Sequence, residues 1–403
     1  MNSRRNLILG AVALVVLTFL ITAGGALYVF SQVVPDTGGA VKLMRAVDLV
    51  RSRYIEPVPL DTLMNGAIQG MVKSLNDPYS IYMDAKMYRE FRMETEGSFS
   101  GVGIVISVKD KQLTVVSPIE GTPGDKAGIR SGDQIVKIDG KDTKDMALDE
   151  AVSKIRGKEG TEVTLTLKRA ETVKDYKLTR ANIEIKTVSS KLLPDKIGLI
   201  RLSMFNEKTA AEFYKQYEAL EAQGMKATIL DLRDNPGGLL DSSVKVSNKL
   251  VPRGTVVSVV TRDGQTEVHR SNLEKVKYPL AVLINGGSAS ASEIVAGAVQ
   301  DTGAGTLIGV KTFGKGSVQS IVKLSNDTAI KLTIAKYATP NNRFINGVGI
   351  DPDMKVENPE PKPDAAARPG RLPINSVNGQ PAGPDQPADL QMEAAIQLLK
   401  GKL

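Results

Sequence analysis

An alternation of short apolar segments with amphipathic ones, between residues 186 and 355, constrains the fold of this chain most strongly. The apolar segments have the length of strands, and the amphipathic segments have the length of helices. We expect strands at residues 197–203, 227–233, 278–285, 306–310 and 329–340, and helices near 207–222, 239–250 and 291–300. Strands that alternate with helices are typical of α/β cores. Residues 186–356 are therefore predicted to form an α/β domain.

Residues 97–185 follow a different pattern, in which short apolar or alternating segments are separated by Gly and Pro. We expect strands at residues 101–108, 113–119, 133–140 and 161–169, and one amphipathic helix at 148–157. This pattern predicts a compact, mostly β module of ordinary domain size. Upstream, residues 36–96 place apolar side chains three and four apart, which predicts a helical region. The fold class is thus a mixed multidomain one with α/β and β parts.

The N-terminus, residues 1–35, bears on location. Leu7–Phe30 is an uncharged apolar run of 24 residues, and Arg4 and Arg5 precede it. About 20 apolar residues are enough for a helix to cross a bilayer, so the run predicts a transmembrane helix. Arginines on its N-terminal side predict that this end is cytoplasmic and that the rest is exported. A cleaved signal peptide is the competing interpretation. The length of the run favours an uncleaved, single-pass anchor in the cytoplasmic (inner) membrane, with the remainder in the periplasm or another extracytoplasmic space.

Composition excludes several kinds of site. The 403 residues include no cysteine and one histidine, which rules out disulfides, thiolate nucleophiles and cysteine-based zinc sites. The formal charge of +7 is spread along the chain without a basic stripe interleaved with aromatics, so nucleic acid is a poor candidate partner.

The C-terminal end combines a linker with a short helix. Residues 357–388 are rich in proline, which predicts an extended linker. In residues 389–403, Asp389 is placed to cap a helix on which Met392, Ile396 and Leu399 share a face. Such a helix docks either on its own domain or on a second subunit, and the sequence leaves both options open.

Residues 285–294, NGGSASASEI, lie where an apolar strand turns through two glycines into a helix. A serine at this junction lies near unpaired backbone N–H groups and the positive end of the helix dipole. The same groups can stabilise an oxyanion, as in a nucleophile elbow, although the G-x-S-x-G spacing is absent. The residues alone favour a plain packing role for these small side chains.

A serine nucleophile also needs a base. The only histidine, His269, lies in a polar segment that predicts a solvated hairpin. A Ser–Lys dyad is the other precedent. Lys315 stands between two glycines after an apolar segment, where burial would lower the lysine pKa, and Gln319 could hold its amine by a hydrogen bond.

Two further stretches need an interpretation. Residues 309–315 match G-x-x-x-x-G-K, the phosphate-binding loop, but Gly316 replaces the Ser or Thr that would bind magnesium, and a strand pattern follows. This argues against an ATPase. In LDLRDNPGG, residues 230–238, Gly237 and Gly238 can expose backbone N–H groups for an oxyanion hole, although an ordinary strand-to-helix turn explains them equally well.

Taken together, DLRDNPGG, GSASASEI and FGKGSVQ, with LNDPYS upstream, resemble the C-terminal processing peptidases, the tail-specific serine proteases of bacteria and chloroplasts. The resemblance extends from about residue 40 to 355 and returns in the terminal DLQMEAAIQLL. It implies a PDZ domain at 97–185 and a crotonase-like α/β serine protease core at 186–356. It also implies cleavage of peptide bonds through an acyl-enzyme, without metal or other cofactor.

The resemblance assigns roles to particular residues. It implies that Ser290 is the nucleophile, Lys315 the base and Gln319 its support, with Ser288 and Ser292 structural and Ser292 a candidate helix cap. The oxyanion donors would be the N–H of Ala291 and that of Gly237 or Gly238, which the sequence does not separate. The loop expected to bind a substrate C-terminus comprises Gly101, Val102, Gly103 and Ile104, and Arg156 is expected to couple the PDZ domain to the active site.

The expected partners follow from the same resemblance. Protein substrates would bind through their C-termini, and the sequence leaves open both a homo-oligomer through the N- and C-terminal helices and an activating adaptor protein. The main alternative is a membrane-tethered PDZ scaffold that binds exported C-termini without cutting them. Ser290, Lys315 and Gln319 argue against the scaffold, and product formation would separate the two functions.

Overall fold

The structure, a computed structural model, describes residues 2–33, 37–109, 112–144, 146–324, 327–359 and 388–403. It divides into two compact units, Met1–Tyr82 and Met83–Leu403. Most of the predicted linker at 357–388 lies outside the described residues.

The first unit is helical, as the spacing of its apolar residues predicted. It comprises α1 (Asn2–Val33), α2 (Thr37–Arg53) and α3 (Leu60–Lys73), followed by the short strand β1 (Ile81–Met83). Among the helices in the described part of the chain, none combines the length and the apolar character needed for a membrane crossing.

The second unit opens with α4 (Ala85–Glu96) and a mostly β module. Asp84 caps α4 by accepting a hydrogen bond from Met87 N at 2.8 Å. Strand β2 (Ser98–Gly101) then pairs with β9 (Ala181–Glu184) at the end of the module. The remaining elements are β3 (Ile104–Lys109), β4 (Gln112–Pro118), α5 (Pro123–Lys126), β5 (Gln134–Ile138), β6 (Lys141–Asp142), α6 (Leu148–Ile155), β7 (Glu162–Arg169) and β8 (Thr172–Thr179). The strand order β3-β4-β5-β7-β8 leaves β3 at the edge of its sheet.

The α/β core is built on a sheet with the strand order β10-β11-β12-β15-β16-β19, in which only the β10–β11 pair is antiparallel. Its strands are β10 (Val188–Leu192), β11 (Ile197–Leu202), β12 (Ala227–Asp231), β15 (Leu280–Ile284), β16 (Thr306–Gly309) and β19 (Met354–Lys355). A second sheet joins β13 (Gly254–Thr261), β14 (Thr266–Ser271), β17 (Ser317–Lys323) and β18 (Ala329–Ala338). The helices are α7 (Thr209–Ala222), α8 (Leu240–Ser247), α9 (Ala291–Asp301) and α11 (Leu390–Lys400). The predicted strands and helices of this region are confirmed.

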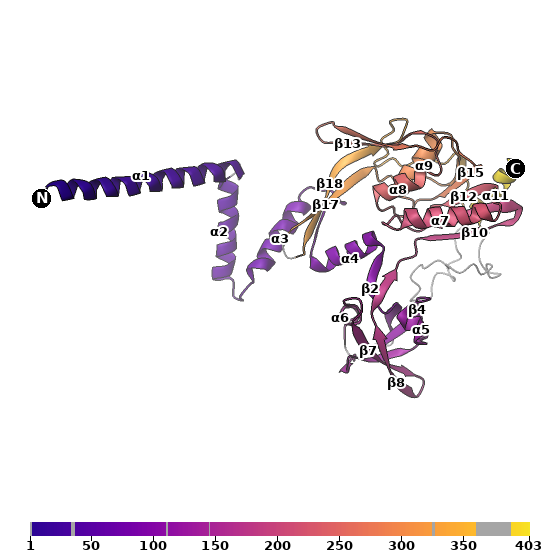
Figure 1. The fold of residues 1–403 in the computed structure, drawn as a ribbon, viewed down its shortest axis with the longest axis horizontal. Coiled ribbons are helices and arrows are strands. Elements are labelled where there is room, and N and C mark those ends of the chain that lie inside the picture. Colours follow the sequence, from indigo (N-terminus) through magenta and orange to yellow (C-terminus); the bar gives the residue numbers. More distant parts are fainter. Residues whose placement is uncertain (1, 34–36, 110–111, 145, 325–326, 360–387) are drawn as a thin grey trace. The chain divides into compact units, whose positions relative to one another are not determined.

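Helices cover both faces of the main sheet, because its buried strands present apolar side chains on either side. Leu230 and Val282 point to one face, where they pack with apolar residues of α7, α8 and α9. Ile229 and Leu283 point to the other face, where they pack with Ala395 of α11. Figure 1 shows α11, at the C-terminal end of the colour scale, beside β12 and β15.

Helix α11 thus docks on its own domain, which was one of the two options left open by the sequence. Asp389 caps it as predicted, by accepting a hydrogen bond from Met392 N at 3.1 Å. Ala395 and Leu399 are fully buried against the sheet, and Met392 and Ile396 pack at the margin of this contact. The predicted face of Met392, Ile396 and Leu399 is therefore the one that contacts the sheet, and Ala395 adds to it.

Candidate active site

Ser290 lies at a strained turn between β15 and α9. Its backbone has φ 53° and ψ −113°, which is an unfavourable region for a residue with a side chain. Such strain costs about 1–3 kcal/mol and persists only where the surroundings enforce it. Ser290 is the N-cap residue of α9, so its side chain stands at the helix N-terminus. The elbow-like geometry suggested by NGGSASASEI is present.

The neighbouring serines have structural roles. Ser288 Oγ donates to Leu232 O at 2.8 Å, and Ser292 Oγ donates to Asn235 O at 2.9 Å. Both side chains are fully buried. The suggestion that Ser292 caps the helix is wrong, because the helix begins two residues earlier with Ser290 at the cap position.

A cavity of about 370 Å³ brings together the predicted dyad residues and the predicted oxyanion loop. Ser290, Lys315 and Gln319 line it. The backbone segments at Gly237, Gly238 and Ala291 also line it, together with apolar side chains that include Phe91, Met204, Leu240, Ile294 and Ile321. Residues far apart in the sequence thus meet at one apolar hollow, as expected for a small-molecule or peptide site.

Glu293 joins the segment of Ser290 to the segment of Lys315. Its fully buried carboxylate accepts hydrogen bonds from Ser290 N at 2.8 Å, Gly314 N at 2.8 Å and Lys315 N at 2.8 Å. It also accepts one from Thr312 Oγ1 at 2.6 Å. A buried carboxylate is stable only when its oxygens are fully hydrogen-bonded, and these four donors meet that need. The segments that carry Ser290 and Lys315 are therefore held at a fixed separation.

Tyr337 makes a second connection between the same two segments. Its hydroxyl donates to Ser290 O at 3.0 Å and lies 2.8 Å from Lys315 O, so one phenol bridges both carbonyls. Burial, and then the nearby Glu293 charge, raises the pKa of the Tyr337 phenol well above its usual range. The phenol is therefore a neutral donor at any ordinary pH.

The two glycines of the 230–238 segment differ in their surroundings. Gly237 has φ 100°, and a Cβ built on it would lie 2.8 Å from Ser290 Cβ and 2.9 Å from Ala291 N. Gly238 has φ 139°, and a Cβ there would lie 2.0 Å from Phe205 O. Only glycine fits either position. The N–H of Gly237 donates to Asn235 Oδ1 at 2.9 Å, so it is engaged within its own loop.

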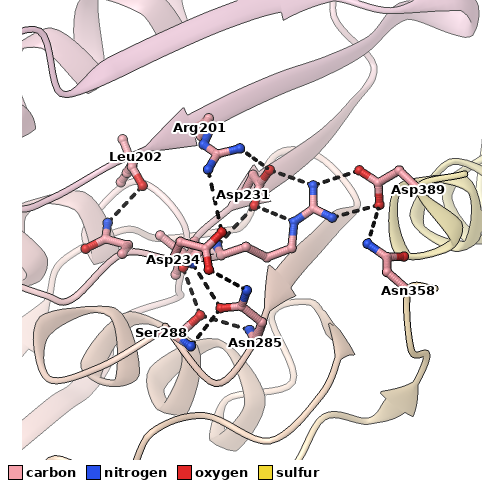
Figure 2. A network of polar contacts seen from close by, with 12 residues as sticks. Arg201, Leu202, Asp231, Asp234, Asn285, Ser288, Asn358 and Asp389 are labelled. Carbon is pink, nitrogen blue, oxygen red and sulfur yellow. Dashed lines mark hydrogen bonds and ion pairs between the residues drawn. The ribbon is translucent and has the colours of Figure 1, made fainter. Parts of the chain in front are cut away.

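Polar contacts bind the 231–238 loop to the nucleophile loop. Asp234 N donates to Asn285 Oδ1 at 2.9 Å, and Ala289 N donates to Asn235 O at 3.0 Å. Figure 2 shows the contact between Asp234 and Asn285, and beside it the cluster that contains Asp231 and Asp389. Arg233 donates to the carboxylates of both Asp231 and Asp389. The active-site loops therefore form one connected polar network.

The structure also tests the other interpretations made from the sequence. His269 is in β14, with Nε2 3.4 Å from Glu267 Oε1, which agrees with a hairpin position. Lys315 is followed by strand β17, as expected for a segment that is not a phosphate loop. Arg156 ends α6 with its guanidinium 4.9 Å from the Phe99 ring centre and Nη1 3.3 Å from Met93 Sδ. Burial lowers the pKa of Arg156.

The predicted carboxylate-binding loop lies at the start of the edge strand β3. Gly103 has φ 72°, and its carbonyl accepts a hydrogen bond from Ile119 N at 2.8 Å. The carbonyl of Val102 accepts one from Gly124 N at 2.8 Å. Both carbonyls are therefore engaged in hydrogen bonds within the module.

Two functional residues escaped the sequence analysis. Glu293 follows Ser290 by three positions, which is the S-x-x-E spacing of a capping box, so a sequence signal was present. Tyr337 carries no such signal, because only the pairing of β18 with β17 brings it beneath the cavity. Among the described residues, no group of three or more His, Asp or Glu side chains has the arrangement of a metal site.

Comparison with known proteins decides the family. Residues 196–356 match Peptidase family S41, residues 114–169 match the PDZ domain, and residues 30–87 match the Activating protease CtpB N-terminal domain. The carboxy-terminal processing protease CtpA of Bacillus subtilis (strain 168) is 40% identical over 355 residues, which cover 87% of this chain and 76% of that protein. The chain belongs to peptidase family S41. It is a serine-type peptidase with a PDZ domain.

Other members of the family give similar matches. The carboxy-terminal-processing protease of Bartonella bacilliformis is 43% identical over 323 residues, which cover 78% of this chain and 74% of that protein. Among solved structures, a photosystem II D1 C-terminal processing protease is 32% identical, with 79% of this chain and 92% of that chain covered and a TM-score of 0.47.

Proposed function

We propose that this S41 peptidase cleaves exported proteins near their C-termini with a Ser290–Lys315 dyad. The observation that carries the proposal is the shared cavity, which Ser290, Lys315 and Gln319 line together with the glycine loop. The strained backbone of Ser290 adds to it, because strain of this kind concentrates at functional sites.

The chemistry is acyl transfer. Neutral Lys315 Nζ takes the proton of Ser290 Oγ as Oγ bonds to the scissile carbonyl carbon. The protonated lysine then gives that proton to the leaving amine as the C–N bond breaks, which leaves an ester on Ser290. Lys315 next takes a proton from water, whose oxygen attacks the ester, and returns it to Ser290 Oγ as the new C-terminus departs.

The oxyanion formed in these steps needs two donors. The N–H of Ala291, at the first turn of α9, is one candidate because helix N-termini leave such groups without an intrahelical partner. Of the two glycines, Gly238 is favoured, because the N–H of Gly237 already donates to Asn235 Oδ1. Gln319 donates through Nε2 to Ser317 Oγ at 2.8 Å, and its oxygen is the atom able to accept from the Lys315 amine.

Substrate capture is assigned to the PDZ module. An extended peptide would add to the open edge of β3, with its terminal carboxylate at the N–H groups of Gly101–Ile104. Arg156 contacts Met93 of α4, and Phe91 and Glu94 of the same helix line the cavity of Ser290. This supports a coupling role for Arg156.

Location and assembly are proposed from the sequence. Leu7–Phe30 is assigned as a single-pass anchor of the cytoplasmic membrane, with the peptidase on the extracytoplasmic side. Release of the full-length chain from membranes by alkaline carbonate would refute the anchor. An activating adaptor protein and a homo-oligomer through the N-terminal helices are further proposals, and both rest on the resemblance to the family.

The dyad is tested by cleavage of an unfolded protein that has an apolar C-terminus. We expect S290A and K315A each to abolish cleavage while circular dichroism shows an intact fold. The matched control is K311A, because Lys311 lies in the same segment but forms an exposed ion pair with Asp351 at 3.2 Å. Full activity in S290A or K315A would reject the dyad. Loss of activity in K311A would show that any change in this segment disrupts cleavage, so that the loss in K315A would not support a specific role of Lys315.

A further inference from the structure

We infer that Arg233 and Asp389 are positioning residues, which use the C-terminal helix α11 to hold the glycine loop of the oxyanion hole in place. This role presupposes the Ser290–Lys315 mechanism proposed above, and it makes the last residues of the chain a supporting part of the active site.

The contact between Arg233 and Asp389 is a paired, charge-assisted one. Arg233 Nη1 lies 2.7 Å from Asp389 Oδ1, and Nη2 lies 2.9 Å from Asp389 Oδ2. Two parallel hydrogen bonds fix the guanidinium plane as well as its position. In Figure 2 the Asp389 carboxylate lies beside α11, and the guanidinium joined to it by dashed lines also contacts Asp231.

All five N–H donors of Arg233 have acceptors. Nε and Nη2 donate to the two oxygens of Asp231 at 2.9 and 2.8 Å, and Nη1 also reaches Gln391 Oε1 at 3.2 Å. The residue is only 9% exposed, so a lost acceptor would leave a buried donor unpaired. Although burial opposes it, hydrogen bonding to Asp231 and Asp389 raises the pKa of Arg233 above its ordinary value. The arginine is thus a charged, fully bonded bridge.

The bridge acts on the loop that carries Gly237 and Gly238. Arg233 lies two residues after the end of β12 and two residues before Asn235. The side chain of Asn235 donates to Leu202 O at 2.9 Å and accepts from Gly237 N. On the opposite side, Asn235 O accepts from Ala289 N and Ser292 Oγ of the nucleophile segment. The glycine loop is therefore held between the nucleophile segment and α11.

The helix itself is well anchored, so it can serve as a fixed support. Ala395 and Leu399 are buried in the sheet face, and Gln391 Nε2 donates to Val356 O at 2.9 Å. Asn358 Nδ2 donates to Asp389 Oδ1 at 3.1 Å, which ties the start of the Pro-rich segment to the residue that follows its end. Asp389 therefore connects the docked helix α11 directly to the loop that carries Gly237 and Gly238.

The test compares D389N with K400M in the full-length protein. Asn keeps the N-cap oxygen of α11 but removes the charge and one acceptor from Arg233. Lys400 forms an exposed ion pair with Asp195 at 2.8 Å at the other end of the helix. We expect D389N to lower kcat about tenfold with KM within about twofold, since small misplacement of oxyanion donors slows the chemical step. K400M should change neither constant.

A purely structural role gives a different result: D389N would lower the melting temperature, but the kcat of the folded variant would equal that of the wild type. That outcome overturns the inference. If D389N does not fold, D389E replaces it, because its longer side chain keeps the charge but displaces the carboxylate. A kcat about two- to threefold lower is then expected, and an unchanged kcat contradicts the role. Absence of cleavage by the wild type would instead refute the proposed peptidase mechanism.

Discussion

The loop that carries Ser290 and the loop that starts β3 are built in opposite ways. Around Ser290, a fully buried Glu293 and Tyr337 fix the backbone through bonds to both catalytic segments. Around Gly103, the loop lies at a sheet edge. The difference fits the roles proposed for the two loops. Bond-breaking chemistry requires geometry set before the substrate arrives, whereas recognition of a peptide end requires a strand edge left open for another strand.

The largest effect is expected from E293Q. The carboxylate accepts from three backbone N–H groups and one hydroxyl, and the amide NH₂ of Gln would face donors. A misplacement of about 1 Å at a catalytic group costs about a hundredfold in rate, so kcat should fall by roughly that factor. Unfolding by urea should show a stability loss of about 1–3 kcal/mol.

The matched control for this change is E162Q, since Glu162 forms an exposed ion pair with Lys177. It should leave kcat and stability nearly unchanged. If E293Q kept the wild-type kcat, the hydrogen bonds of Glu293 would not be needed to fix the loop of Ser290, and the proposed difference between the two loops would be wrong.

A smaller effect is expected from Y337F. The change deletes one hydroxyl and leaves the carbonyls of Ser290 and Lys315 without this partner, while Glu293 still joins the two segments. We expect kcat to fall about tenfold and stability to drop by about 1–2 kcal/mol. The control is Y217F, since Tyr217 is also a buried tyrosine but lies in α7 and does not line the cavity of Ser290. Equal loss of kcat in both variants would mean that general stability, not the bridge, sets the rate.

A change in the substrate is expected to affect binding and not the chemical step, and it tests the PDZ loop side of the comparison. Replacing the terminal carboxylate of a model substrate by an amide removes the charge that the Gly101–Ile104 N–H groups would bind. We expect KM to rise about tenfold, since hydrogen bonds to a charged group contribute about 1.5–3 kcal/mol, while kcat stays within about twofold. Equal KM values for acid and amide would place carboxylate recognition elsewhere.

The sequence predicted the architecture because strands and helices here follow local apolar patterns. Residues 227–233 and 291–300, for example, match β12 and α9 closely. It also brought Ser290, Lys315 and Gln319 together, but through resemblance to a family, since each segment alone favoured a plainer interpretation. Tyr337 and the Arg233–Asp389 pair escaped, because they depend on strand pairing and on a contact across 156 positions. Long-range contacts of this kind leave no periodic pattern.

The central claim is that Lys315 activates Ser290, and covalent labelling tests it most directly. A fluorophosphonate forms a phosphorus–oxygen bond with an activated serine as fluoride leaves, and peptide mapping by mass spectrometry locates the adduct. We predict an adduct on Ser290 in the wild type and in K311A, and none in folded K315A. An adduct on Ser288 or Ser292 instead, or equal labelling rates in K315A and the wild type, would contradict the account.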